Sequence, residues 1–164
     1  MKTRKTALAF ILMAVLAVTA NAQQYDPESD FKFDWDPNVK DGVMITQYIG
    51  TKKEVRIPPS IQNYPVTSIG VGVTSIVGEG AFYGNKNITR ITIPNSVISI
   101  GGAAFDNCTS VTFQGTIAAD NLGSTIDGTF YSPFPGDLLD KYLASDGGPG
   151  TYVRLAGNTS WRKR

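Results

Sequence analysis

The chain has 164 residues, with 15 Lys and Arg, 14 Asp and Glu, no His and one Cys, and its net charge at pH 7 is +1. Without His, the Ser-His-Asp and Cys-His catalytic arrangements and the common zinc sites are excluded, because the base or ligand that they require does not exist. A single Cys cannot form an intramolecular disulfide. A charge near zero argues against nucleic acid or an anionic membrane as the main partner.

The N-terminal segment has the three parts of a secretory signal peptide. Three basic residues within the first five positions precede an apolar run over 7–18, and the small residues of 20–22 fit a signal-peptidase site. The apolar run is shorter than the ~20 residues that a membrane-spanning helix needs. We therefore predict a signal peptide over 1–22, Sec-type export, and a mature protein without a membrane span in the periplasm, on the cell surface or outside the cell. The mature chain has 12 Lys and Arg against 14 Asp and Glu, a net charge of −2.

Residues 23–40 are rich in Asp and Pro and are predicted to be a mobile, solvated acidic leader that passes into a first strand over 31–35. Oxygen-bearing side chains that could suggest a calcium loop lie at Asp34, Asp36, Asn38 and Asp41. The turn Gly and the closing Glu of an EF-hand are missing, so we interpret this segment as solvated and expect no metal site.

Short apolar clusters with period-two alternation begin at Val43. Clusters over 43–49 and 55–57 are separated by turn signals at 49–51. Strands spaced this closely predict a capping sheet that leads into a repeat domain.

Two stretches of the chain repeat one phrase. Residues 80–89 match residues 103–112, and the period from Phe82 to Phe105 is 23 residues, inside the ~20–29 residue range of leucine-rich repeats. A unit this short cannot bury its own apolar face and must stack on like neighbours. Over 41–131 we predict two to three repeats of about 23 residues that form a short right-handed solenoid, a strongly β-rich member of the α/β repeat class.

Alternating isoleucines at 91–93 and 98–100 mark two short strands in the second repeat. The recurring Phe82, Phe105 and Phe130 could form an exposed aromatic stripe. Recurrence at the repeat period beside Ala and Gly is more typical of an internal stack, so we assign these rings to the core.

An insertion of eight residues distinguishes the first repeat from the second and falls within 70–80. Insertions in solenoids fall in loops on one face, where they can bind partners. A tandem slip of a small motif would leave the same trace, so a binding loop and an extra coil both stay open.

Residues 132–164 are predicted to form a C-terminal cap. Asp137 is placed to N-cap a short helix over 138–144. Segments 151–155 and 159–162 indicate a hairpin. The helix positions predicted to face the last coil are Leu139, Tyr142 and Leu143.

A longer phrase carries a family resemblance. Ile-Pro-Asn-Ser-Val-Ile-Ser-Ile-Gly-Gly-Ala-Ala-Phe-Asp-Asn-Cys at 93–108 and Asp-Gly-Val-Met-Ile-Thr-Gln-Tyr-Ile-Gly at 41–50 resemble the BspA-type, or Treponema-type, leucine-rich repeats of bacterial cell-surface and secreted proteins. The chain departs from the family pattern at Asn85, where a Cys is expected. The resemblance implies that Cys108 points into the solenoid as a buried thiol, and that the protein acts as an adhesin or interaction module without catalysis.

These features favour an exported, monomeric, non-catalytic protein-binding module of adhesin type, with no cofactor, whose partner is a host matrix protein or a bacterial surface protein. The alternative is a structural or accessory protein of the cell envelope without a host ligand, and a carboxylate-based hydrolase is least favoured. Arg154 and the basic residues of 162–164 are expected to be a solvated end. The residues predicted to contact a partner, from the insertion and the hairpin, are Val71, Val73, Thr74, Ser75, Val77, Tyr152, Arg154 and Trp161.

Overall fold

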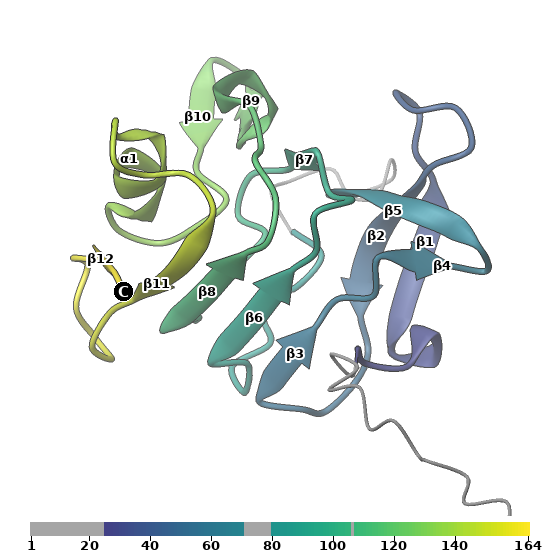
Figure 1. The fold of residues 1–164 in the computed structure, drawn as a ribbon, viewed down its shortest axis with the longest axis horizontal. Coiled ribbons are helices and arrows are strands. Elements are labelled where there is room, and N and C mark those ends of the chain that lie inside the picture. Colours follow the sequence, from purple (N-terminus) through teal and green to yellow (C-terminus); the bar gives the residue numbers. More distant parts are fainter. Residues whose placement is uncertain (1–24, 71–79, 106) are drawn as a thin grey trace, which may run out of the picture.

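The computed structural model describes residues 25–70, 80–105 and 107–164. These residues form twelve strands, one α-helix and two 3₁₀ helices, so the described chain is strongly β-rich (Figure 1). Among them, no helix is long and apolar enough to pass through a membrane.

One five-stranded sheet contains most of the N-terminal strands. The predicted first strand is confirmed as β1 (Phe31–Trp35), which pairs antiparallel with β2 (Val43–Tyr48). Strand β2 runs parallel to β5 (Tyr64–Ile69), which pairs antiparallel with the short β4 (Ser60–Ile61). Strand β7 (Ser99–Ile100) adds to β5 in parallel.

The second five-stranded sheet holds the repeating strands. Strands β3 (Glu54–Arg56), β6 (Arg90–Ile93) and β8 (Ser110–Phe113) lie side by side in parallel register (Figure 1). Two antiparallel strands, β11 (Gly150–Val153) and β12 (Arg162–Lys163), extend the sheet beyond β8 in the order β12-β11-β8-β6-β3. The two predicted strands of the second repeat are therefore confirmed as β6 and β7, and the predicted C-terminal hairpin is present with its second strand at 162–163 rather than 159–162.

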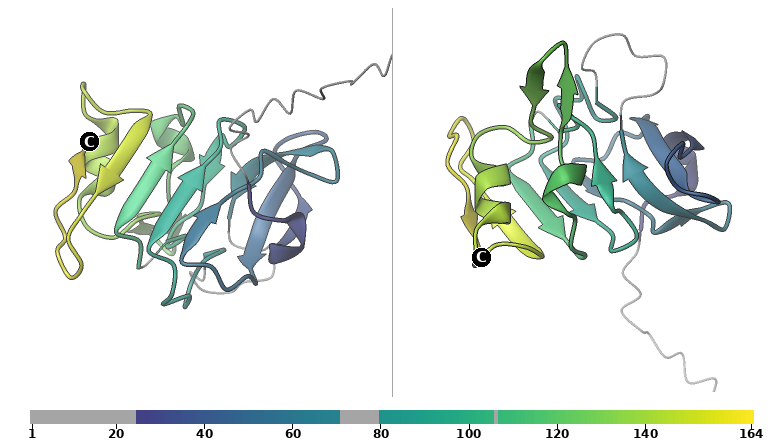
Figure 2. Two further views of the ribbon diagram at one scale, coloured as in Figure 1. Left: turned by 60° about the horizontal axis from the view of Figure 1, so that its bottom comes forward. Right: turned by 90° about the horizontal axis from the view of Figure 1, so that it is seen from above.

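The remaining elements are short. They are the 3₁₀ helices η1 (Glu28–Asp30) and η2 (Ala119–Asn121), the hairpin of β9 (Ser124–Ile126) and β10 (Thr129–Tyr131), and helix α1 (Leu138–Leu143). The β9–β10 hairpin projects from the two larger sheets (Figure 2).

Alternation along the strands of the second sheet builds the core. Val55, Ile91, Val111 and Tyr152 lie opposite one another on four neighbouring strands, and all four are buried. Successive side chains of a strand point to opposite faces, so the residues on either side of this row face solvent.

A stack of aromatic rings continues the core. Its members differ from the predicted series at one position, Phe130. Ring centroids lie 4.9 Å apart for Phe82 and Phe105 and 5.3 Å apart for Phe105 and Phe134. Phe130, which we assigned to the core, is 55% exposed. Phe130 lies on the β9–β10 hairpin, away from the core, and Phe134 takes the next place in the stack.

The packing of α1 also differs from the prediction. Leu138 and Tyr142 are buried, whereas Leu143 is 46% exposed, so the prediction that Leu143 faces the core is wrong. Asp137 precedes the helix as predicted but makes no side-chain capping bond. Its Oδ1 instead accepts a hydrogen bond of 2.7 Å from the backbone N of Trp161, which ties the start of the helix to the C-terminal hairpin.

The acidic leader is not uniformly solvated, because Asp26 and Asp36 are both buried. Asp26 accepts hydrogen bonds from Lys52 Nζ at 2.6 Å and from the backbone N of Arg56 at 3.0 Å. Asp36 accepts a bond of 2.7 Å from Thr67 Oγ1. These two carboxylates anchor the N-terminal segment to later strands, so the prediction of a solvated leader is wrong at these positions.

Candidate functional site

The solvent face of the second sheet carries an arginine-rich surface. Arg90 and Ser110 lie opposite each other on β6 and β8, and Val153 and Arg162 continue the same row on β11 and β12. In the next row the backbone N of Arg164 bonds to Thr151 O at 2.8 Å. This register places side chains from distant parts of the sequence on one face.

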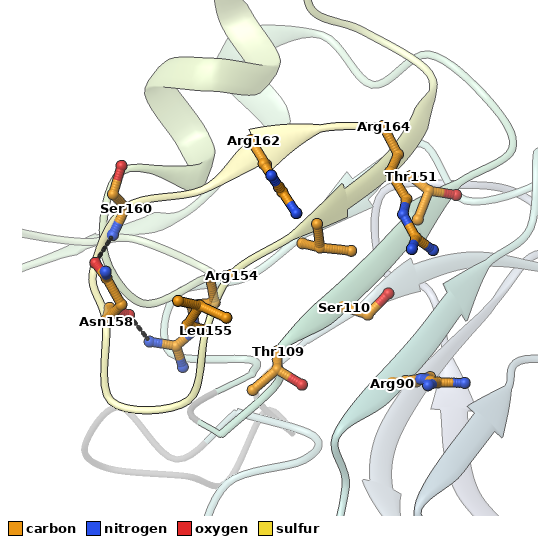
Figure 3. Close-up of a pocket in the computed structure, with 11 residues that line it drawn as sticks. Arg90, Thr109, Ser110, Thr151, Arg154, Leu155, Asn158, Ser160, Arg162 and Arg164 are labelled. Atoms are coloured by element: carbon orange, nitrogen blue, oxygen red, sulfur yellow. Dashed lines mark hydrogen bonds between the residues drawn. The ribbon is translucent and has the colours of Figure 1, made fainter.

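A groove with a volume of about 720 Å³ lies on this face (Figure 3). Figure 3 shows Arg162 and Arg164 on its β12 side and Arg90 on its β6 side, with Ser110 between them. Among the described residues, the groove lining includes no acidic and no aromatic side chain. The neutral residues that line it are Thr109, Ser110, Thr151, Val153, Leu155, Asn158 and Ser160.

Arg154 is fixed within the wall of the groove. Its Nε donates a hydrogen bond of 2.9 Å to Cys108 O, and Nη1 donates one of 2.8 Å to Asn158 O. The guanidinium also lies 5.2 Å from the centre of the Trp161 ring, within cation–π range. Arg154 therefore holds the loop after β11 against the turn before β8.

The other three arginines are available for a ligand. Arg90 forms an ion pair of 2.8 Å with Glu54, but both side chains are more than half exposed. A pair of this kind contributes only ~0.2–1 kcal/mol, so Arg90 can exchange partners at little cost. Within the described part of the chain, Arg162 and Arg164 side chains make no hydrogen bond or ion pair.

Lys163 belongs to the other side of β12. Its Nζ donates hydrogen bonds to Gly147 O at 2.7 Å and Asp146 O at 3.2 Å, and it lies 5.9 Å from the centre of the Tyr152 ring. Because successive side chains of a strand point to opposite faces, the basic residues of the C-terminal end lie on two different faces of β12. Arg162 and Arg164 face the groove, and Lys163 holds the turn after α1.

A family model for the BspA type leucine-rich repeat region, with six copies, matches residues 55–132. The chain contains a BspA-type leucine-rich repeat region. The resemblance inferred from residues 93–108 is thereby confirmed. Leucine-rich repeat regions generally mediate protein interactions and are typically non-catalytic, and BspA-type proteins are generally surface or secreted proteins.

A solved structure is similar to part of the chain. The crystal structure of a leucine-rich repeat protein from T. pallidum is 32% identical, with a TM-score of 0.42, over 50% of this chain and 34% of that chain. This chain therefore spans about a third of the length of that structure. No curated protein matches the chain.

The groove lies at the C-terminal boundary of the BspA-type region. Arg90 and Ser110 belong to the matched residues, whereas Arg154, Arg162 and Arg164 follow them. The site is therefore completed by the hairpin that packs on the last repeat strand.

Two of the predicted partner-binding residues are buried in the structure. Tyr152 and Trp161 are 0% and 2% exposed, so the prediction that their side chains form a partner surface is wrong. Tyr152 Oη donates a hydrogen bond of 2.8 Å to Gly148 O, and Trp161 Nε1 donates one of 2.8 Å to Pro135 O. Burial raises the pKa of Tyr152 above its ordinary value. The Tyr152 ring packs edge-on against Phe113 of the BspA-type region at 5.8 Å, whereas Trp161 ties the hairpin to the segment before α1.

Arg154 is the predicted residue that the structure places in the groove. The other five predicted positions lie outside the described residues, at Val71, Val73, Thr74, Ser75 and Val77.

The sequence did not predict a binding role for three of the groove arginines. The basic sequence at 162–164 predicts a solvated end, although the spacing of two between Arg162 and Arg164 within a predicted hairpin is also typical of side chains on one face of a strand. Arg90 carries no such signal, because only the pairing of β6, β8, β11 and β12 brings it near them.

Within residues 25–70, 80–105 and 107–164, no three His, Cys, Asp or Glu side chains gather closely enough to hold a metal ion. Cys108, the one cysteine of the sequence, is buried at 2% exposure.

Proposed function

We propose that this protein is an exported, non-catalytic binding module of adhesin type that grips a protein partner on the solvent face of its second sheet. The observation that carries the proposal is the groove at the end of the BspA-type region, where Arg162 and Arg164 face solvent without a partner in the described chain. Solubility alone does not require unpaired arginines in a concave surface, so their presence there favours a binding role.

The proposal includes a short solenoid of two to three coils. Parallel register of β3, β6 and β8 on one side and of β2, β5 and β7 on the other supports it. The strands β1 and β2 would close one end, and α1 with β11 and β12 would close the other. Residues 1–22 would be removed as a signal peptide, which leaves the mature, monomeric protein in the periplasm, on the cell surface or secreted.

The groove chemistry favours binding over catalysis. Guanidinium groups stay protonated at any physiological pH, and the hydroxyls of Ser110 and Thr151 are weak acids. General acid–base catalysis needs a group that titrates near the working pH. The described lining provides hydrogen-bond donors and acceptors but no such group.

A photo-crosslinking experiment tests the proposed function. A photoreactive amino acid replaces Leu155, which lines the groove and is 75% exposed, and in a matched control it replaces Ile49, which is 50% exposed elsewhere. The mature protein is then offered purified host matrix proteins and bacterial envelope proteins, and crosslinked partners are identified by mass spectrometry.

The expected result is saturable crosslinking of a defined protein from position 155 and not from position 49. Crosslinking from neither position to any offered protein would contradict the proposal. Firm retention in envelope fractions without saturable protein capture would favour the alternative, a structural or accessory envelope protein.

A further inference from the structure

The geometry of the groove points to a specific chemistry of partner, an inference that rests on the proposed function. We propose that the groove binds an extended, acidic polypeptide segment whose carboxylates are held by Arg90, Arg162 and Arg164. The charges, the spacing and the neutral lining each support this occupant independently.

The charge of this face opposes the charge of the chain. The mature chain has 12 Lys and Arg against 14 Asp and Glu, a net −2, yet four arginines and no acidic side chain are found among the described groove lining. Glu54, which pairs with Arg90 at 2.8 Å, brings an opposing carboxylate to its margin. Cations concentrated in a concave surface attract anionic partners, because low-dielectric walls focus the field.

The spacing of the arginines lets an extended peptide reach both sides of the groove. Arg162 and Arg164 are two residues apart along one edge of the groove, about 7 Å at the rise of a strand. Arg90 lies three strands from Arg162 in the order β12-β11-β8-β6, about 14 Å at the usual strand separation. An extended peptide that crosses the strands presents residues i and i+4 at about 14 Å, so one carboxylate can reach Arg90 while another reaches the pair of Arg162 and Arg164.

The guanidinium group suits carboxylates in particular. Its planar fork donates two parallel hydrogen bonds to one carboxylate, which makes such pairs stronger and more directional than those of Lys. Arg162 and Arg164 have their donors unused within the described chain, and the pair of Arg90 with Glu54 is exposed and exchangeable. Hydroxyls of Ser110 and Thr151 lie between them and can bond to a peptide backbone.

The neutral lining distinguishes a peptide from other polyanions. Single-stranded nucleic acid is usually held by aromatic side chains on which its bases stack, and the described lining has no aromatic residue. A sulfated polysaccharide has little apolar surface to offer Leu155, which is 75% exposed at the groove, or the neighbouring Val153. A polypeptide can place an apolar side chain there between two acidic ones.

Fluorescence anisotropy with a defined probe tests this inference. The probe is a labelled peptide in which Glu alternates with Ser and Leu, and its control has Gln in place of every Glu. The mature protein is compared with the double variant Arg162→Gln with Arg164→Gln, and with Lys40→Gln, which removes an exposed charge from the loop between β1 and β2. Thermal melting confirms that each variant is folded.

The Glu probe should bind the parent protein and Lys40→Gln alike, and the double variant about tenfold more weakly or worse, since two charge-assisted contacts are lost. Replacement of both arginines by Lys should restore part of the affinity, because the charge returns without the fork. Equal affinity for the Glu and Gln probes, or no effect of the double variant, would overturn the inference. So would binding of heparin without binding of the Glu probe.

The two proposals can fail separately. If position 155 crosslinks a defined protein but the Glu probe neither binds nor competes, the acidic segment is wrong and protein binding stands. If the Glu probe binds with the expected arginine dependence but no offered protein is captured, the groove chemistry stands and the adhesin-type function fails.

Discussion

Truncation of Phe105 is the most direct test of how the repeats are held together. Its ring is 1% exposed and lies between Phe82 at 4.9 Å and Phe134 at 5.3 Å, centroid to centroid. Truncation of a buried Phe to Ala costs ~3–5 kcal/mol through lost burial and the cavity left behind. Because two aromatic contacts of ~0.5–1.5 kcal/mol each are also lost, we expect Phe105→Ala to cost unfolding free energy at the upper end of this range, about 5 kcal/mol.

A matched control uses a Phe that differs only in its surroundings. Phe130 is 55% exposed on the β9–β10 hairpin, so Phe130→Ala should cost less than about 1 kcal/mol. Urea titration followed by circular dichroism measures both variants, and Phe105→Leu provides a milder third if Phe105→Ala does not fold. A cost below about 1 kcal/mol for Phe105→Ala, or equal costs for both Ala variants, would refute the stacked-ring account of the core.

Three further predictions concern the N-terminal anchor, the thiol and the insertion. Burial raises the pKa of Asp36, but hydrogen bonds to the carboxylate, the largest from Asn38 N and Thr67 Oγ1, together outweigh it and leave that pKa below its ordinary value of 3.8. The stabilisation is therefore complete above about pH 4 and is lost as pH falls through the folded pKa. Thr67→Val should lower the unfolding free energy by ~1.5–3 kcal/mol at pH 7 and by less below pH 3. The control variant Thr67→Ser keeps the hydroxyl and should retain most of the stability. A loss of stability that does not change with pH would contradict the role of the Asp36 carboxylate. Cys108 should react with a maleimide only after unfolding, and rapid labelling of the native protein would show that it is accessible. Replacement of residues 71–77 by a Gly-Ser linker, followed by titration with the partner, tests whether the insertion or the groove binds that partner. If the insertion binds, the variant should have an unchanged melting curve and a weaker affinity for the partner. If the groove binds, the affinity should be unchanged.

The sequence by itself determined the repeating part of the protein. The 23-residue period, the strands at β1, β6 and β7, and the family all follow from local patterns, because each repeat unit solves the same packing problem as its neighbour. Phe82 and Phe105 could be assigned to the core for the same reason, since two equivalent positions in stacked units meet the same surroundings.

Only the tertiary structure decided what happens at the two ends, where no equivalent unit fixes the environment. At the C-terminal end, Phe134 replaces Phe130 in the ring stack, and Tyr152 and Trp161 are buried because the last repeat strand must be covered. At the N-terminal end, Asp26 is buried because its carboxylate satisfies backbone and side-chain donors of a later segment. The groove has the same origin: its arginines lie far apart in sequence, and the pairing of β11 and β12 onto β8 brings Arg162 and Arg164 onto the face that already carries Arg90.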